Sequence, residues 1–215
     1  MRALILGLAA VLAAPAAGAV AAIVPLDSYA VEVDVDGDDQ TDELNVVNAK
    51  DGQQTRLEIT TATGEGAVVK VPWRGDDIAT PAGGRFEGVS PLRVADQSDV
   101  VIRVRNGQCS SYRVLRWEDG ELRTVPRPGG GKNWKVCALG VTDTGFGYRV
   151  ATGKLRNTVV TYRAKAVDTS EGVQLQTTRY RWKDGTWRKM SRKKRNVVPQ
   201  SLLGHWGLDF PWRSS

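Results

Sequence analysis

The sequence predicts an all-β fold built from antiparallel hairpins. Short runs of β-branched and aromatic residues alternate with polar residues, and Gly, Asp, Asn and Pro separate the runs, as expected for half-buried strands. Two Asp-Gly pairs, Asp119–Gly120 and Asp184–Gly185, stand between such runs and favour two-residue hairpin turns, because both central residues of these turns have positive φ. No window of a dozen residues beyond Leu26 shows a persuasive apolar period of 3.6, which argues against long helices.

The alternating runs place the expected strands, and an internal repeat groups them into units. The strands are expected at residues 29–33, 43–47, 56–60, 67–71, 99–104, 112–117, 147–150, 158–162 and 173–177. The pattern Arg-Trp-x-Asp-Gly-x-(Leu/Trp)-Arg occurs from Arg116 and again from Arg181, 65 residues later. An offset of this length is typical of a repeated multi-strand unit, and about three such units would fill the chain.

The first 22 residues have the order of a secretory signal peptide. Arg2 precedes an apolar stretch that ends at Leu12, and Pro15 and a series of small residues follow, as around a cleavage point. An uncleaved membrane anchor is the alternative, because the apolar run extends to Leu26 and nearly reaches the length that spans a bilayer. We expect a secreted or cell-surface protein whose mature chain has no transmembrane segment.

The remainder divides into a β-repeat domain at residues 23–196 and a C-terminal tail at residues 197–215. The tail is apolar and aromatic, with Trp206 and Phe210 among its residues. We expect it to fold back and cover a sheet edge, whose backbone groups would otherwise be unpaired. Docking of the tail onto a partner is the alternative.

The two cysteines, Cys109 and Cys137, are expected to form a structural disulfide. Oxidising compartments favour pairing, and closing this loop contributes about 3–4 kcal/mol in the chain-entropy model. The alternative, a reactive thiol, would need an activating base, and His205 is the single histidine.

The most specific motif is the acidic segment at residues 34–42. Its carboxylates stand mainly at alternate positions, repel one another unless a cation neutralises them, and offer the oxygen ligands that Ca²⁺ prefers. Mg²⁺ suits the segment less well, because it retains more of its water. The expected calcium ligands are Asp34, Asp36, Asp38, Gln40 through its carbonyl oxygen, and Asp42. A solvated acidic turn is the alternative.

The pattern Asp-x-Asp-Gly-Asp-x-x-x-Asp-Glu-Leu, followed by a Val-rich strand, resembles the calcium loop of FG-GAP/VCBS-type repeats over residues 34–47. These repeats occur in integrin-alpha-like propellers and in many secreted bacterial proteins. The resemblance implies four-stranded blades, calcium held in a loop between strands, and a role in adhesion or carbohydrate-associated recognition. About three units are fewer than a full propeller requires, so we expect blade-like hairpin units in an open or compact array.

Charge is distributed unevenly along the chain, whose net charge is +6. Residues 1–100 carry 16 Asp and Glu against 7 Lys and Arg, whereas residues 101–215 carry 8 against 23. This asymmetry suggests either internal complementarity or two separate binding faces.

A basic cluster follows the second Asp-Gly pair and would attract polyanions. Because we expect the protein to be exported, acidic polymers of the cell surface are the expected partners, and nucleic acid is not. The cluster consists of Arg188, Lys189, Arg192, Lys193, Lys194 and Arg195. A solvated linker is the alternative.

The sequence lacks Gly-x-Ser-x-Gly, a phosphate-binding loop and His-Glu-x-x-His, which are signatures of common enzyme classes. The tryptophans are expected to pack in the core rather than to stack on sugars; they include Trp73, Trp117, Trp134, Trp182 and Trp187. We expect a secreted, non-enzymatic, calcium-stabilised protein that binds a surface glycan or a protein partner. The alternatives are a module that binds polyanions through its basic half, and a hydrolase with an unrecognised carboxylate site, such as Asp76 and Asp77.

Overall fold

The computed structural model describes residues 27–74, 79–92, 98–140, 144–151, 157–167, 172–198, 202 and 207–212. The expected leader, the Asp76–Asp77 pair and His205 lie outside these residues. Within them the chain is almost entirely β-structure in antiparallel hairpins that form open sheets, so the predicted fold class is confirmed. No helix in the described part of the chain is long and apolar enough to cross a membrane.

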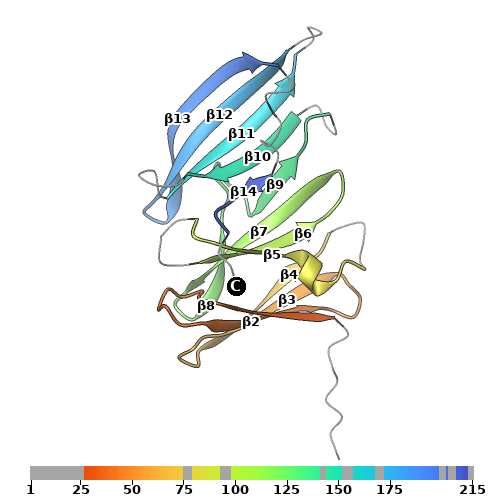
Figure 1. Ribbon diagram of the computed structural model, residues 1–215, viewed down its shortest axis with the longest axis vertical. Helices are drawn as coiled ribbons and strands as arrows, with labels where there is room; N and C mark the ends of the chain where they lie inside the picture. Colours follow the sequence, from red (N-terminus) through yellow and green to blue (C-terminus); the bar gives the residue numbers. More distant parts are fainter. Residues whose placement is uncertain are drawn as a thin grey trace, which may run out of the picture.

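The first sheet is a four-stranded antiparallel meander at the lower end of Figure 1. Its strands are β1 (Ser28–Val33), β2 (Asp42–Asn48), β3 (Gln54–Thr60) and β4 (Gly66–Pro72). Each strand alternates apolar and polar residues, so that one face of the sheet is buried, with Leu44, Leu57 and Ile59 at most 2% exposed. The short helix α1 (Ala82–Arg85) then leads to the second sheet.

The second sheet has ten strands and continues to the upper end of Figure 1. Eight of them follow the order β13-β12-β11-β10-β9-β7-β6-β5, while β8 pairs with β7 and β14 pairs with β10. Their bounds are β5 (Phe86–Ser90), β6 (Asp99–Arg105), β7 (Cys109–Glu118), β8 (Glu121–Val125), β9 (Asn133–Cys137), β10 (Thr144–Val150), β11 (Thr158–Ala166), β12 (Val173–Lys183), β13 (Thr186–Val197) and β14 (Leu208–Asp209).

Both repeated Asp-Gly pairs form hairpin turns. Asp119 and Gly120 join β7 to β8 with φ of 53° and 75°, and Asp184 and Gly185 join β12 to β13 with φ of 51° and 71°. Positive φ at both central residues is the geometry that matches the twist of the flanking strands. The two copies of the repeat therefore form the same kind of hairpin turn. Both copies belong to one sheet and do not form separate sheets.

Strands β6 and β7 separate two hydrophobic cores. In β6, Val100 and Ile102 belong to the core shared with the first sheet, whereas Val101 belongs to a second core. In β7, Leu115 and Val114 divide in the same way. Since successive side chains of a strand point to opposite faces, the uninterrupted apolar run of β6 reflects burial on both sides.

The second core is built around Trp134, whose side chain is fully buried. Its ring centroid lies 5.0 Å from that of Tyr148, 5.8 Å from that of Phe210 and 6.2 Å from that of Trp187. The indole N–H groups are paired, because Trp134 donates to the Val125 carbonyl at 3.3 Å and Trp187 to the Pro126 carbonyl at 2.7 Å. Trp73 and Trp117 are also buried, and Trp182 is half-buried against Trp187, so these indoles are packing residues rather than an exposed sugar platform.

The C-terminal segment joins distant parts of the second sheet. Leu208 and Asp209 pair in parallel with β10, and farther on the Ser90 hydroxyl of β5 donates to the Pro211 carbonyl at 3.2 Å. Trp212 then lies against Gly88 of β5 so closely that a Cβ on this residue would be 2.9 Å from the indole. Gly88 has a φ of 132°, so both its backbone conformation and this contact favour glycine.

The predicted disulfide is confirmed. Cys109 of β7 and Cys137 of β9 face each other as a cross-strand pair and are covalently linked. The bond joins the strands of the central region to the strands that lead to the upper end of the sheet.

We predict that Trp134→Ala lowers the free energy of unfolding by about 3–5 kcal/mol, because it removes the ring around which the second core packs. Trp212→Ala is the control, since the Trp212 side chain is 41% exposed, and should cost less. Urea denaturation followed by circular dichroism measures both losses. An equal loss of unfolding free energy in the Trp134→Ala and Trp212→Ala variants would contradict the central position of Trp134.

Candidate functional site

The acidic segment forms the loop between β1 and β2. Its flanking residues are strands, as expected, and the loop bends at Gly37 and Asp39, whose φ values are 88° and 64°. Glycine adopts such angles without steric cost, and aspartate tolerates them better than most residues. The loop is further shaped by its own carboxylates, because Asp34 accepts a hydrogen bond from the Gly37 N–H at 2.7 Å and Asp38 one from the Gln40 N–H at 2.8 Å.

Three of the predicted ligands converge. One oxygen from each of Asp34, Asp36 and Asp42 lies within 4.8 Å of the others. Ca²⁺ binds oxygen at about 2.3–2.6 Å, so oxygens this close can contact a single ion between them. Asp38 is not part of this group, and its other carboxylate oxygen accepts from the Gln40 side-chain amide at 3.0 Å. Both of these side chains are exposed.

Asp42 has a structural function that the sequence did not reveal. Its side chain is 1% exposed, and its two oxygens accept hydrogen bonds from the Val35 N–H at 2.7 Å and the Ala62 N–H at 2.9 Å. Ala62 belongs to the turn between β3 and β4. The carboxylate thus connects the acidic loop to a neighbouring turn, and one of its oxygens also lies within 4.8 Å of an oxygen of Asp34 and of Asp36.

The electrostatics of the loop favour a cation. Partial burial raises the pKa of Asp36, a hydrogen bond from the Asp38 backbone N–H opposes this shift, and the charges of Asp42, Asp38 and Asp34 raise the pKa further. The ionised form of Asp36 is therefore less favourable in the folded protein than in the unfolded chain. A bound cation would reverse this unfavourable interaction.

The basic cluster is part of a strand, so the linker interpretation of residues 188–195 is wrong. The cluster lies in β13, a twelve-residue strand at the end of the strand order of the second sheet, and all six of its cations are exposed. Because β-strand side chains alternate, the cluster divides between the two faces of the sheet. Cross-strand pairing places Lys193 and Arg195 on the face of Thr177 and Leu175, and Arg192 and Lys194 on the face of Thr178 and Gln176.

The neighbouring strands extend the basic surface. Strands β10–β13 together carry twelve Lys and Arg residues and no Asp or Glu. Only Arg149 among these twelve forms an ion pair with an acidic side chain of the described residues, at 3.9 Å from Asp209. We call β10–β13 the basic sheet. Sequence reasoning missed Arg163, Lys165 and Arg179. Strand pairing places Arg179 of β12 beside β13, and Arg163 and Lys165 one strand farther away in β11.

A hollow of about 130 Å³ lies on one face of the basic sheet. It is lined by three cations and two hydroxyl groups, from Thr177, Arg179, Ser191, Lys193 and Arg195. Guanidinium, ammonium and hydroxyl groups are donors that recognise carboxylate, sulfate and phosphate. The hollow can therefore hold one acidic group of a larger ligand.

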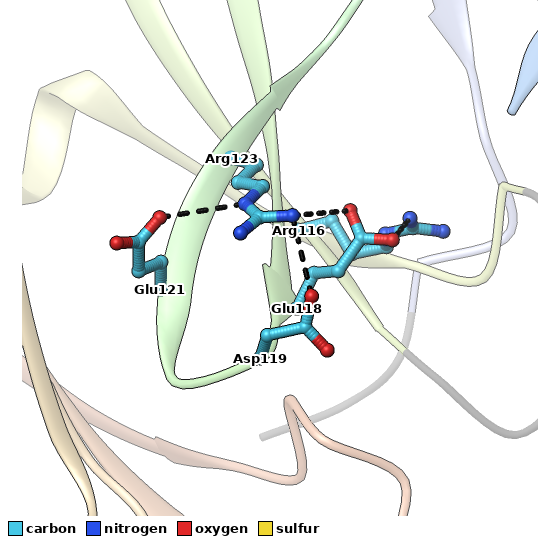
Figure 2. A network of polar contacts seen from close by, with 5 residues as sticks. All are labelled: Arg116, Glu118, Asp119, Glu121 and Arg123. Carbon is cyan, nitrogen blue, oxygen red and sulfur yellow. Dashed lines mark hydrogen bonds and ion pairs between the residues drawn. The ribbon is translucent and has the colours of Figure 1, made fainter.

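The two Asp-Gly hairpins, β7–β8 and β12–β13, differ in the acidic residues beside their cations. In β7–β8, Arg116 contacts Glu118, and Arg123 lies 3.3 Å from Asp119, 3.4 Å from Glu121 and 4.0 Å from Glu118 (Figure 2). In the second copy, Lys183 stands at the position of Glu118, and Thr186 at that of Glu121. Two of the three acids that neutralise the first hairpin are thus replaced, and no carboxylate of the described residues pairs with the cations of the second.

Comparisons of the chain with protein-family models, with curated proteins and with solved structures find no match.

We predict that Asp42→Asn lowers the free energy of unfolding by about 1–3 kcal/mol in the presence of a chelator, because an amide cannot accept both backbone hydrogen bonds and leaves a buried N–H unpaired. Asp38→Asn, at an exposed position of the same loop, should change stability by less than about 0.5 kcal/mol. Urea denaturation with EDTA gives both values. An unaltered stability of the Asp42 variant would contradict the structural function of this carboxylate.

Proposed function

We propose that this protein is an exported, non-enzymatic, calcium-stabilised β-sheet protein that binds acidic polymers of a cell surface through its basic sheet. The observation that carries the proposal is the presence of twelve Lys and Arg residues without any Asp or Glu on four neighbouring strands. Like charges on one sheet repel one another in the free protein. A polymer with repeated acidic groups would neutralise several of them at once.

The contrast between the two hairpins supports a binding function over a merely solvated surface. The first copy pairs its arginines with glutamates and an aspartate, whereas no cation of the second copy forms an ion pair with an acidic side chain of the described residues. The hollow with Arg179, Lys193 and Arg195 adds a place where an acidic group would be held by several donors. We assign the strongest contact with the polymer to this hollow.

Calcium would support the fold at the opposite end of the molecule (Figure 1). The carboxylates of Asp34, Asp36 and Asp42 fit the ion by their mutual distances and by the charge that they concentrate. A bound ion would supply the positive charge that holds these groups together. A four-stranded meander with the acidic loop between its first two strands also suits the FG-GAP/VCBS resemblance.

Export rests on the expected leader and agrees with the disulfide between Cys109 and Cys137, which oxidising compartments favour. A cell-surface location would bring the basic sheet close to acidic glycans and teichoic-acid-like polymers. These polymers carry the repeated anionic groups that the proposal requires.

Calcium is predicted to raise the melting temperature of the wild-type protein, with a gain in stability of about 2.7 kcal/mol when calcium exceeds its Kd a hundredfold. Asp36→Asn should respond less to calcium. In EDTA at neutral pH the variant should be more stable than wild type, because the raised pKa of Asp36 means that its ionised form disfavours folding.

Lowering the pH through the pKa of Asp36 protonates the wild-type carboxyl, so the difference between wild type and Asp36→Asn in EDTA should shrink as the pH falls. Differential scanning calorimetry at several pH values measures both effects. Identical melting of the wild type in calcium and in EDTA would refute the stabilising site.

Retention on an immobilised acidic polysaccharide tests the proposed function. The triple variant Arg179→Gln, Lys193→Gln, Arg195→Gln should elute at clearly lower salt than wild type. Its affinity should be reduced by about 0.6–3 kcal/mol, since each of the three exposed ionic contacts contributes about 0.2–1 kcal/mol. Its control is the triple variant Arg56→Gln, Lys70→Gln, Arg105→Gln, which removes three exposed cations outside the basic sheet. Elution of both variants at the same salt concentration would show that net charge alone causes retention.

A further inference from the structure

A second cationic hollow is formed by residues of the four-stranded and the ten-stranded sheet and contains no residue of β10–β13. It has a volume of about 370 Å³ and is lined by Pro72, Arg74, Val104, Arg113, Gly131, Lys132 and Asn133. Pro72 ends β4 of the first sheet, whereas Val104 and Arg113 belong to β6 and β7. A hollow of this size can accept a small organic molecule, for which pockets of about 300–1,000 Å³ are usual.

Its charged lining is entirely positive. Arg74, Arg113 and Lys132 contribute three cations, and no carboxylate of the described residues lines the hollow. Within the described part of the chain, the buried Nε of Arg113 has no hydrogen-bond partner, while its Nη2 donates to the Asn133 side-chain oxygen at 3.3 Å. A buried donor without a partner is costly, and a small rotation of the Arg113 side chain, which lines the hollow, would bring this donor to an oxyanion bound there.

The electrostatic environment of Arg113 supports the same conclusion. Burial lowers the pKa of its guanidinium, and the nearby charge of Arg74 lowers that pKa further. An anion bound between two neighbouring cations offsets their mutual repulsion. The charge of the hollow is thus suited to an anionic ligand.

Two other buried or partly buried arginines, Arg85 and Arg103, have acceptors or a counterion for their guanidinium groups. Arg85 is fully buried, but its guanidinium donates to the Thr80 carbonyl at 3.2 Å and the Gly52 carbonyl at 2.9 Å and lies 4.3 Å from the ring centre of Trp73. Arg103 also has an unpaired buried Nε, yet its Nη2 contacts the Glu87 carboxylate. Arg113 differs from both, because its described neighbours provide neither several acceptors nor a counterion.

We propose that the hollow between β4, β6 and β7 binds a small anionic molecule through an oxyanion group, with Arg113 and Arg74 as the principal donors. A planar guanidinium presents paired N–H groups that match carboxylate, sulfate or phosphate oxygens. Pro72 and Val104 supply an apolar wall for the remainder of the ligand. This site does not depend on the polymer-binding function of the basic sheet.

The test is an NMR titration of the full mature chain with sodium sulfate and, separately, with sodium glucuronate, at constant ionic strength set by sodium chloride. Saturable shifts of the Arg113 Nε–H resonance are expected with either ligand. Tighter binding of glucuronate would assign the site to a sugar acid, and tighter binding of sulfate to an inorganic oxyanion. The absence of a saturable shift with both ligands would overturn the proposal.

Three variants locate the binding. Arg74→Gln changes an exposed side chain and is expected to weaken binding at least threefold. Arg113→Lys keeps the charge but removes the Nε–H, and is expected to weaken binding at least fivefold, monitored by backbone amides of β7. Arg56→Gln removes one cation from β3, outside the hollow, and should leave the affinity unchanged.

An affinity unchanged in both the Arg74 and Arg113 variants would overturn the assignment. Neutralising Arg179, Lys193 and Arg195 should have no effect on this titration. The two proposals can therefore fail independently: loss of polysaccharide retention concerns the basic sheet, and loss of the Arg113 shift concerns this hollow.

Discussion

Burial of the β6–β7 strand pair on both faces is the constraint on which the rest of the structure depends. One face packs against the first sheet through Val100, Ile102 and Leu115, and the other packs toward Trp134 through Val101 and Val114. Because the same two strands belong to both cores, removal of apolar area from water on either side stabilises the same backbone. The Cys109–Cys137 bond and the C-terminal contacts with β5 and β10 hold the remaining strands around this pair.

This central pair also separates the two charged regions. The acidic loop lies in the first sheet and the basic sheet at the other end of the molecule (Figure 1), so these two regions do not neutralise each other by contact. Beyond about 8–10 Å such charges are largely screened in physiological salt. The proposed cation site and the proposed anion-binding surface would therefore act independently of each other.

The basic edge strand β13 combines two physical effects. Lysine and arginine along an edge discourage pairing with the edge of another sheet, because like charges would be brought together. The same residues attract an anionic polymer, which does not need backbone pairing to bind.

Arg113 differs from these exposed cations of β13. Its guanidinium is partly buried in a hollow without a described counterion, and burial gives it a stronger preference for an anion than an exposed position does.

Nine of the strands, the two Asp-Gly turns, the cysteine pair and the position of the acidic loop could be predicted from the sequence, because alternation, turn chemistry and residue type act over a few neighbouring positions. Strands β5, β8, β9, β13 and β14 were not among the expected ranges. Strand order and register, in contrast, make Asp42 a buried acceptor for Val35 and Ala62, place Arg179 beside the β13 cluster, and bring Arg74 to the same hollow as Arg113. Ala62 is 20 positions from Asp42, and Arg74 and Arg113 also lie far apart in the sequence. Such residues become neighbours only when the sheets have formed, because their contacts depend on strand order and register.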